Sequence, residues 1–393
     1  MIDWVLECSL CGKGTSTAGL PTVCECGQPL LVRYPKRHPD PAGRGKASAA
    51  RGMWRFREFL PLVDGELPVT LGEGDTPLLA TPRIGARIGL PGVMVKDEGT
   101  NPTGSFKARG LSAAITRAVA GGARAFTLPT AGNAGVAAAA YGARAGIPVR
   151  VYAPKTTPAT ILSQITSYGG DLRLLDGHIG DSGKASRGYA AESGAFDLST
   201  LREPYRIEGK KTLGLELAEQ LGWNLPDAIV YPTGGGTGLI GMWKVFQELN
   251  EAGWVSGPLP RMYTVQAEGC APVVKAFLAG ADRCEPWPDP WTIASGLRVP
   301  GALGDRLMLR ALRESGGGAV AVSDAELALE ASQGSRLEGI DFAPEGGAAI
   351  AAARTLRESG VLFPEDKVVL FNTGAGWLYR DVGIASGVTR SDI

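Results

Sequence analysis

Short apolar segments alternate with helical segments from about residue 90 onward, and this alternation restricts the fold more than any other feature. The predicted strands cover 93–98, 125–129, 149–154, 171–176, 227–232, 261–269 and 367–374. The predicted helices cover 133–145, 158–168, 181–192 and 239–249, and a further helix follows Thr103. Strands that alternate with helices pair in parallel and carry helices on their faces. The pattern therefore predicts an α/β fold with parallel-rich sheets covered by helices.

The length of the chain, 393 residues, predicts two or three domains, because a domain averages about 150 residues. Residues 1–34 form a short module that holds four of the six cysteines. Residues 35–50 are rich in proline, glycine and lysine, which is typical of a linker. Glycine is about twice as common as in an average protein, and its even spread favours turns between strands and helices.

The charge balance restricts the partners that we expect. The 40 basic and 40 acidic side chains give a formal net charge of zero, which argues against general binding to nucleic acids or anionic membranes. No apolar span approaches the roughly 20 residues that a bilayer requires. The N-terminal segment MIDWVLECS contains acidic residues and lacks the apolar core of a signal peptide. We therefore expect a cytoplasmic protein that binds a small molecule.

Four cysteines near the N-terminus have the spacing of metal ligands. Cys8 and Cys11 form a CxxC pair, and Cys24 and Cys26 form a tighter CxC pair. Four thiolates satisfy a tetrahedral zinc ion, but the CxC spacing is narrower than usual. Two alternatives stay open, a structural zinc site and a zinc-ribbon-like module whose thiols are free. In both cases the role is structural, because four protein ligands leave no open position on the metal.

The segment NPTGSFKARG, residues 101–110, places Lys107 and Arg109 in the first turn of a predicted helix. An acidic residue would suit this end of a helix dipole better than a cation. One interpretation is a solvated surface lysine. The other is that the helix N-terminus and the second cation disfavour the ammonium form of Lys107, as a Schiff-base nucleophile requires.

The segment PTGGGTGLIG, residues 232–241, predicts a strand, a glycine-rich turn and a helix. This arrangement presents backbone N–H groups to a phosphate. Residues 236–241 also match GxGxxG, so an NAD-dependent dehydrogenase is an alternative. The acidic residue that a dinucleotide site requires comes too late, at Glu268, so the loop favours a single phosphate monoester.

A lysine suited to imine formation and a loop suited to one phosphate together indicate pyridoxal 5′-phosphate (PLP). TAGNAG, residues 130–135, places Asn133 at a helix start, where its amide can bond the phenolic oxygen of the ring; the alternative is an ordinary N-cap. NTGAG, residues 372–376, follows the last strand. The hydroxyl of Thr373 can meet the pyridine nitrogen, and the alternative is a plain turn.

Six motifs share one order along the chain: LGEGDTPLL (71–79), KDEGTNPTGSFKARG (96–110), PTAGNAG (129–135), PYRIEGKKT (204–212), PTGGGTG (232–238) and NTGAG (372–376). This order resembles that of the fold-type II PLP enzymes, and within them the threonine synthase family. The resemblance runs from the cysteine module to about residue 380. It implies a tryptophan-synthase-β-like enzyme of two domains that acts as a homodimer on a small amino acid.

The resemblance also implies domain limits and site residues. The larger, PLP-binding domain is expected at 51–105 and 196–393, and the smaller, substrate-side domain at 106–195. Lys107 matches the imine lysine, Asn133 the partner of the ring oxygen and Thr373 the partner of the pyridine nitrogen. The residues that match the phosphate loop are Gly234, Gly235, Gly236, Thr237 and Gly238.

The chain departs from the threonine synthase pattern on the substrate side. The family's Ser-Thr-Gly-Asn-Thr is here Thr130, Ala131, Gly132, Asn133 and Ala134; its Asn-Ser pair is Thr200 and Leu201; and an alanine, Ala108, follows the imine lysine in place of an acid. The substrate contacts that remain are expected from Thr130, Ala131, Gly132, Asn133 and Arg206. Further anion contacts are conceivable from Lys155, Lys210, Lys211 and Arg298, although a surface position is expected for the three lysines.

We therefore expect a PLP-dependent lyase that eliminates or replaces a leaving group at Cβ or Cγ of an amino acid. The nearest activity is that of threonine synthase, which converts O-phospho-L-homoserine and water to L-threonine and phosphate. An alternative is a β-eliminating or β-replacing enzyme, such as a dehydratase or a cysteate-synthase-like catalyst. A third alternative is a PLP-binding regulatory protein without catalytic activity.

Overall fold

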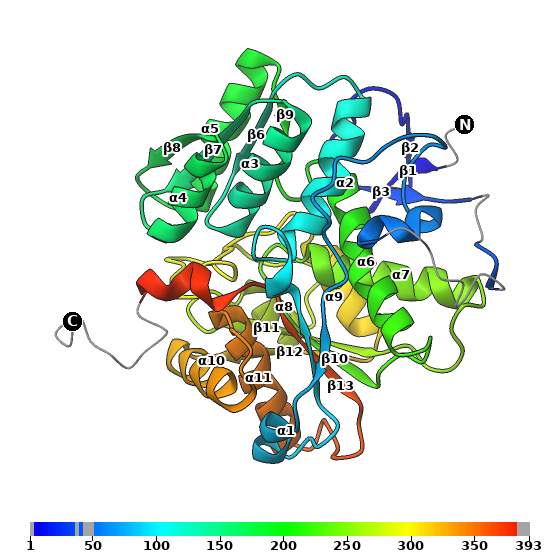
Figure 1. The fold of residues 1–393 in the computed structure, drawn as a ribbon, viewed down its shortest axis with the longest axis vertical. Helices are drawn as coiled ribbons and strands as arrows, with labels where there is room; N and C mark the ends of the chain where they lie inside the picture. Colours follow the sequence, from blue (N-terminus) through cyan, green and yellow to red (C-terminus); the bar gives the residue numbers. More distant parts are fainter. Residues whose placement is uncertain (1–3, 36–38, 42–50, 383–393) are drawn as a thin grey trace. The chain divides into compact units, whose positions relative to one another are not determined.

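The computed structural model describes residues 4–35, 39–41 and 51–382, and it divides the chain into two compact units (Figure 1). The first unit contains residues 1–75, 107–216 and 244–254, and the second contains 76–106, 217–243 and 255–393. Each unit has its own parallel sheet, as the strand and helix pattern predicts. Most of the linker expected at 35–50 lies outside the described residues. Within those residues, no helix has both the length and the apolar character that crossing a membrane requires.

The sheet of the first unit has four parallel strands in the order β8-β7-β6-β9. The strands are β6 (Phe126–Pro129), β7 (Val149–Pro154), β8 (Asp171–Leu175) and β9 (Phe196–Asp197). The helices of this unit include α2 (Lys107–Ala120), α3 (Asn133–Ala145), α4 (Ala159–Ser167), α5 (Ile179–Ser193) and α6 (Tyr205–Gln220). Because β7 pairs with one side of β6 and β9 with the other, the chain reverses its direction of strand addition at β6.

The cysteine module belongs to the first unit and forms a small antiparallel sheet. Its strands β1 (Val5–Cys8), β2 (Gly14–Thr15) and β3 (Leu30–Arg33) lie in the order β2-β1-β3. A 3-10 helix, η2 (Met53–Phe59), follows the linker. The apolar core of the module is shared with Tyr205, the first residue of α6. The module is therefore packed against the start of a helix that carries a predicted substrate residue, Arg206.

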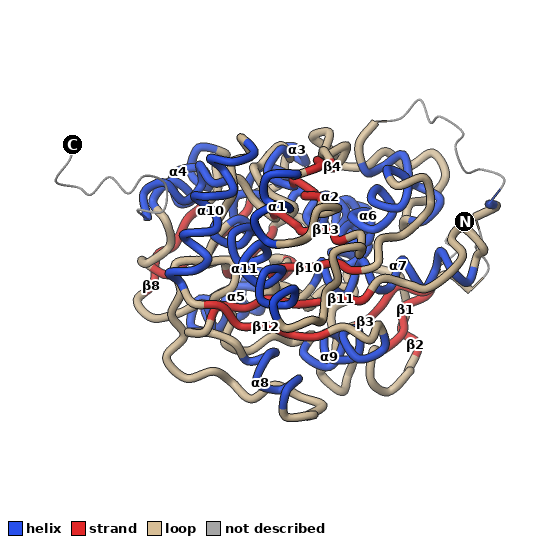
Figure 2. Tube along the Cα trace, turned by 90° about the horizontal axis from the view of Figure 1, so that it is seen from below, coloured by secondary structure: helices blue, strands red, loops and turns tan. Residues whose placement is uncertain are grey.

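The sheet of the second unit has six strands in the order β12-β11-β10-β13-β5-β4 (Figure 2). All neighbours are parallel except β4 and β5. The strands are β4 (Leu78–Ala80), β5 (Met94–Asp97), β10 (Ala228–Pro232), β11 (Arg261–Ala267), β12 (Gly318–Val322) and β13 (Val368–Asn372). Every residue of β10 and β13 is buried, so these two strands form the centre of the core.

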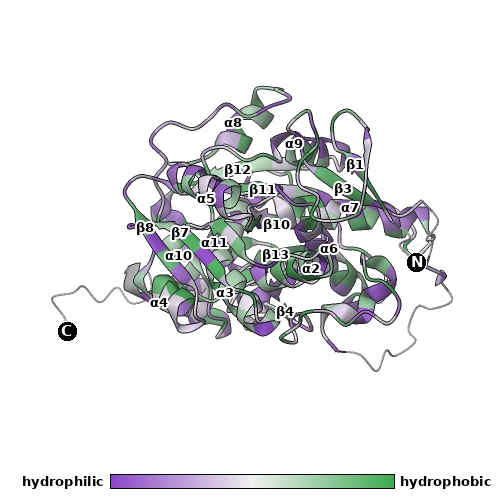
Figure 3. Cartoon of the chain, turned by 90° about the horizontal axis from the view of Figure 1, so that it is seen from above, coloured by the Kyte–Doolittle hydropathy of each residue, from purple (hydrophilic) through white to green (hydrophobic). Residues whose placement is uncertain are grey.

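Helices surround this sheet and supply the rest of its core. They are α1 (Pro82–Ile88), α7 (Thr237–Glu251), α8 (Pro272–Leu278), α9 (Asp305–Glu314), α10 (Asp324–Glu338) and α11 (Pro344–Glu358), with the 3-10 helices η3 (Glu98–Thr100) and η4 (Gly376–Val382). Helix α7 begins in the second unit, and its residues from Lys244 onward belong to the first. Helix α11 is alanine-rich and almost wholly buried. By contrast, Figure 3 shows hydrophilic and hydrophobic residues mixed along α10.

The structure confirms the α/β fold and differs from the prediction in detail. Each predicted strand and helix is present within a few residues of its expected limits, but α1, α6 and the four helices α8 to α11 were not predicted. The predicted domain limits place residues 51–75 and 196–216 in the larger domain, whereas both segments cluster with the first unit. The predicted boundary at 105–106 falls one residue before the observed one, at 106–107.

Candidate active site

Three loops of the second unit lie at one edge of its sheet. They follow β10, β13 and β5, which are adjacent parallel strands, so their carboxyl ends share that edge. The loop after β10 holds the glycines, the loop after β13 holds Thr373, and the loop after β5 leads to Lys107. The order of strands reverses between β10 and β13, and ligands of open α/β sheets bind at such a point.

The glycine loop packs too closely against its surroundings to accept side chains. A Cβ at Gly234 would lie 2.2 Å from the carbonyl oxygen of Gly296, and one at Gly236 would lie 2.2 Å from Sδ of Met308. Gly236 also has a φ of 79°, which glycine adopts at little cost. The first N–H groups of α7 have no partner within the helix, because the helix begins at Thr237. The loop therefore offers a close backbone approach and free donors to one phosphate group.

The loop that leads to Lys107 is bound to the loop that contains Thr373. The amide of Phe106 donates to the carbonyl oxygen of Thr373 at 3.0 Å, and the amide of Ala375 donates to the carbonyl oxygen of Gly104 at 2.8 Å. At the start of both loops, Asn372 donates its side-chain amide to Asp97 at 2.9 Å. Phe106 directly precedes Lys107 in the chain, so these bonds fix the backbone from which the lysine emerges.

Lys107 is the first residue of α2 and is partly buried. The second cation of the motif, Arg109, is fully buried and forms two hydrogen bonds to Glu216, at 3.0 and 3.2 Å. The carboxylate of Glu216 therefore compensates the charge of Arg109. Of the two positive neighbours that the sequence suggested for Lys107, the helix N-terminus is thus the one whose charge Glu216 does not offset, since Lys107 is the first residue of α2.

The loop after β6 in the first unit holds the predicted substrate segment. Asn133 is the first residue of α3 and is partly exposed, as is Ala131. The hydroxyl of Thr130 accepts hydrogen bonds from the amides of Gly132 and Gly135, both at 3.0 Å, and donates to the carbonyl oxygen of Gly132 at 2.6 Å. The hydroxyl of Thr130 thus fixes the shape of its own loop and the first turn of α3.

Arg206 lies near the same edge of the first unit's sheet. Its Nη1 donates to the carbonyl oxygen of Leu198 at 2.8 Å and to the hydroxyl of Thr200 at 3.3 Å. These acceptors follow β9, the parallel neighbour of β6. The loop that Arg206 contacts and the loop that contains Thr130 therefore lie at the same end of the sheet. Burial lowers the pKa of Arg206, while Glu203 and Asp197 oppose this effect. Within the described part of the chain, Nε and Nη2 have no acceptor.

Glu203 was not singled out in the sequence. Its carboxylate is buried and accepts hydrogen bonds from the amides of Tyr205 at 2.7 Å and Arg206 at 3.1 Å, at the start of α6. Burial raises the pKa of Glu203 to about 7, although Arg206 and the two amides act in the opposite direction. A glutamate three residues before a predicted substrate arginine was the available signal.

The four cysteines of the N-terminal module converge. Their sulfur atoms all lie within 4.8 Å of one another, and pairs stand 3.4 Å (Cys8 and Cys26), 3.7 Å (Cys11 and Cys24) and 3.9 Å (Cys11 and Cys26) apart. A tetrahedral zinc ion with Zn–S bonds of about 2.3 Å holds its sulfurs about 3.8 Å apart. The donor set therefore fits a zinc ion in both chemistry and spacing.

The lysines proposed as further anion contacts divide into two kinds. Lys155 is exposed and pairs with Asp176, as expected for a surface residue. The surface positions predicted for Lys210 and Lys211 are wrong, because both side chains are fully buried. Lys211 forms ion pairs with Glu208 at 2.8 Å and Glu248 at 2.9 Å. Burial of such long charged side chains requires partners, which sequence alone does not display.

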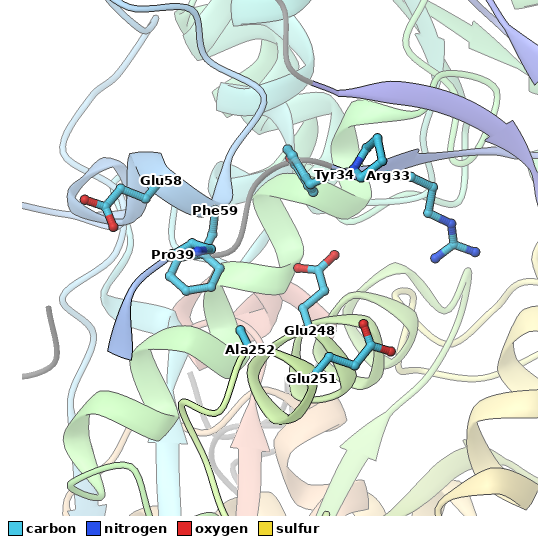
Figure 4. Close-up of a pocket in the computed structure, with 9 residues that line it drawn as sticks. Arg33, Tyr34, Pro39, Glu58, Phe59, Glu248, Glu251 and Ala252 are labelled. Atoms are coloured by element: carbon cyan, nitrogen blue, oxygen red, sulfur yellow. The ribbon is translucent and has the colours of Figure 1, made fainter. Parts of the chain in front are cut away.

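A cavity of about 280 Å³ lies beside this charged cluster in the first unit (Figure 4). Figure 4 shows Glu248 and Glu251, both from α7, among the lining residues, with the carboxylate of Glu248 on the side of Tyr34. The lining contains neither Lys107 nor any residue of the glycine loop. We therefore do not assign this cavity to the predicted chemistry.

The comparisons with known proteins identify the family of the chain. The model of a family described as pyridoxal-phosphate-dependent enzymes matches residues 69–374, and the chain belongs to this family. Membership confirms the resemblance found in the sequence and argues against the dinucleotide interpretation of residues 236–241. The glycine loop, Lys107 and Thr373 are residues that suit such a cofactor.

Several similar proteins are named threonine synthase. The threonine synthase of Methanosarcina acetivorans is 37% identical over 323 residues, which cover 82% of this chain and 79% of that protein. The threonine synthase of Methanocaldococcus jannaschii is 33% identical over 381 residues, which cover 96% of this chain and 94% of that protein. The second alignment extends over nearly the whole chain.

Solved structures of related enzymes share the fold. Maize serine racemase matches with a TM-score of 0.67 and 24% identity, over 77% of this chain and 88% of that one. Diaminopropionate ammonia lyase from Escherichia coli matches with a TM-score of 0.68 and 19% identity, over 81% of this chain and 89% of that one. At these identities the matches confirm the fold-type II architecture alone.

Proposed function

We propose that this protein is a PLP-dependent lyase with threonine synthase activity, which converts O-phospho-L-homoserine and water to L-threonine and phosphate. The similar proteins named threonine synthase support this proposal, at 33% and 37% identity over 96% and 82% of the chain. The observation that carries the cofactor assignment is the shared sheet edge of three loops, which contain the glycines, Thr373 and the approach to Lys107.

Each predicted site residue would hold a different part of the cofactor. The amine of Lys107 would bind it covalently, and the amides of the glycine loop, Gly234 to Gly238, would bind its phosphate. The side-chain amide of Asn133 would bond the ring oxygen, and the hydroxyl of Thr373 would face the pyridine nitrogen. When bound, PLP supplies a sink for the electrons released at the substrate's Cα.

The remaining steps use side chains of the protein. The amine of Lys107, when it is not bonded to the cofactor, would take and return the proton at the substrate's Cα. The neutral hydroxyl of Thr373 cannot keep the pyridine nitrogen protonated as a carboxylate would. This weaker sink suits elimination and replacement at Cβ or Cγ better than transamination.

The substrate's phosphate requires a cation, and Arg206 is our candidate. Its buried guanidinium has two nitrogens that no described residue satisfies, and it contacts the loop after β9. Arg–phosphate pairs are strong because the planar guanidinium matches two oxygens at once. The loop from Thr130 to Asn133 would contact the substrate through its backbone and the side-chain amide of Asn133.

The experiment that tests the activity measures phosphate release from O-phospho-L-homoserine, together with L-threonine formation. Ammonia and keto-acid release from L-threonine and L-serine is measured in parallel. We expect phosphate and threonine in equal amounts and little keto acid. No turnover of O-phospho-L-homoserine, with brisk keto-acid release from serine or threonine, would overturn the proposal.

One observation favours a second candidate, a β-eliminating or β-replacing enzyme. The Thr130 hydroxyl, the one hydroxyl that the substrate segment retains, already donates its proton to the carbonyl oxygen of Gly132 at 2.6 Å. The protein then has fewer donors for a substrate phosphate than the threonine synthase pattern contains. The same parallel assay separates the two candidates.

We also propose that Cys8, Cys11, Cys24 and Cys26 bind one structural zinc ion. The expected result is about one zinc per chain after purification without chelators. Cys11→Ser should lose the metal, whereas Cys284→Ser, which alters a cysteine outside the module, should keep it. Purified protein that contains no metal and has four freely reactive thiols in the module would contradict this assignment.

The cytoplasmic location and the homodimer stay predictions. Analytical ultracentrifugation tests the homodimer, and a mass of one chain at assay concentrations would contradict it.

A further inference from the structure

The start of α6 holds an unusual group of buried charges. Arg206 and Glu203 are each about 1% exposed, and Asp197 lies at the end of β9 close enough to influence the charge of both. Buried ionised groups are costly unless partners compensate them. The net charge of these three groups therefore affects which ligands the site can bind.

Only one of the two carboxylate oxygens of Glu203 has hydrogen-bond donors within the described residues. One carboxylate oxygen accepts the amides of Tyr205 and Arg206, which are the first N–H groups of α6. The other oxygen, Oε1, has no donor among the residues that the structure describes. The N-terminus of a helix is a common site for a bound anion. In this chain a carboxylate of the protein itself occupies that position.

The guanidinium of Arg206 also has only part of its hydrogen bonds within the described residues. Nη1 is used by Leu198 and Thr200, whereas Nε and Nη2 lack an acceptor within the described residues. No ion pair joins Arg206 to Glu203 within that part of the chain, although each influences the pKa of the other. Two donors of a buried guanidinium are thus left for a ligand, and an anion with several oxygens is the ligand that matches them.

The other charged groups around the start of α6 do not compensate the negative charge of Glu203. Asp197 accepts the amide of Ser199 at 2.9 Å and also its hydroxyl, both through Oδ1. Arg117 of α2 faces the Tyr205 ring at 5.9 Å but is paired with Glu66 at 2.6 Å. With Arg206, Glu203 and Asp197 all ionised, the group carries one positive and two negative charges, which opposes the entry of a dianion.

We propose that Glu203 controls the charge of the anion subsite at Arg206: above neutral pH it is ionised when the subsite is empty and takes up a proton when an anion binds. The proposal rests on the proposed function, because it takes the substrate's phosphate to be the natural anion at Arg206. It makes Glu203 a specificity-determining residue, since its ionised form repels the dianionic leaving group that its protonated form admits.

The linkage between anion and proton has a calculable size. The pKa of Glu203 in the empty site is about 7, so roughly nine-tenths of the carboxyl is protonated at pH 6 and one-tenth at pH 8. If the anion binds only the protonated form, its affinity falls about tenfold from pH 6 to pH 8. Binding at pH 8 then takes up close to one proton, and binding at pH 6 takes up almost none.

The test uses sulfate as the probe, because sulfate keeps its charge throughout this pH range and phosphate does not. Isothermal titration calorimetry of the cofactor-loaded protein is run at pH 8 in two buffers that differ in ionisation enthalpy, and the difference gives the number of protons taken up. For the wild type we expect close to one proton and about tenfold weaker binding than at pH 6.

Matched variants test whether Glu203 is the residue that takes up the proton. Glu203→Gln keeps an oxygen for the two helix amides but cannot ionise, so it should bind sulfate about tenfold more tightly than the wild type at pH 8, with no proton uptake. Asp197→Asn should retain the uptake, and Arg206→Gln should lose sulfate binding. Circular dichroism checks that each variant is folded. The wild-type proton count stands by itself if Glu203→Gln fails to fold.

The outcomes separate this inference from the proposed function. Sulfate binding without proton uptake at pH 8, the same uptake in folded Glu203→Gln, or no sulfate binding to the wild type overturns the inference. Turnover of O-phospho-L-homoserine alongside any of these results leaves the proposed function intact. Conversely, proton-linked sulfate binding without that turnover supports the subsite and refutes the proposed substrate.

Discussion

The two sheets each carry candidate ligand residues beyond the carboxyl ends of their strands, but these residues differ in kind. In the second unit, Gly234 and Gly236 approach neighbouring atoms so closely that no Cβ fits. In the first unit, Arg206 and Glu203 supply buried charges whose bonds are incomplete. One region offers a ligand the shape and N–H groups of its backbone, and the other offers side-chain charge.

This difference suits two kinds of ligand, a cofactor that stays the same and a substrate that differs between related enzymes. A phosphate held by backbone amides depends on a conformation that few substitutions preserve, which suits a cofactor that never changes. A subsite made of buried charges changes its preference when one residue is replaced or gains a proton. We therefore expect the two regions to respond to mutation and to pH in different ways.

The largest expected effect is that of Lys107→Ala. The loss of the amine that binds the cofactor and moves the Cα proton should lower turnover by about 10³-fold or more. The variant should fold normally, because Lys107 is partly exposed at the first position of α2. Turnover and the visible absorption of added cofactor are measured together. Turnover within tenfold of the wild type would remove Lys107 from the chemistry.

Glu203→Gln tests the charge-based region through stability. The folded-state pKa of about 7 lies above the ordinary value of 4.5, so the folded protein holds the proton more tightly than the unfolded chain. The stability that this provides is complete below pH 4.5 and is lost as the pH rises through 7, a total of about 3 kcal/mol. Urea denaturation from pH 4.5 to 8 should therefore show the wild type losing stability relative to the variant. Parallel curves would show that Glu203 titrates normally.

Gly236→Ala tests the backbone-based region, and Gly316→Ala is its control. Both glycines have a positive φ, 79° and 64°, so each alanine should cost about 1 kcal/mol of strain. A Cβ at residue 316 meets nothing within 4 Å, whereas one at residue 236 meets Met308. We expect about tenfold weaker cofactor binding for Gly236→Ala alone, about 1.4 kcal/mol, measured by fluorescence titration. Equal cofactor affinities would show that the loop tolerates a side chain.

The comparison also explains what the sequence could predict. Glycine spacing, strand periodicity and the position of Lys107 are local patterns, and they predicted the second unit's loops and the strands that precede them. The burial of Lys210 and Lys211 is not local, because it depends on partners such as Glu248, which lies 37 residues further along the chain. Helix α6 was missed for the same reason, since buried charges on it conceal the usual apolar face.

The cysteine module shows the same limit. Its four sulfurs were predictable as a cluster from CxxC and CxC, and the structure brings them together. Its packing on Tyr205 was not predictable, because the contact joins residues nearly 200 positions apart. Sequence thus indicates which residue types form a site, whereas tertiary packing decides which of them are buried, paired or left to bind a ligand.

The smallest expected effect is that of Lys155→Ala, which sharpens the comparison by separating surface charge from buried charge. Lys155 is 59% exposed and its partner Asp176 is 87% exposed, so solvent screens their interaction. We expect a change in stability below about 0.5 kcal/mol and an unchanged KM for O-phospho-L-homoserine. Urea denaturation and steady-state kinetics measure these quantities. A KM increase of tenfold would mean that Lys155 binds the substrate's anion, and the subsite would then extend beyond Arg206.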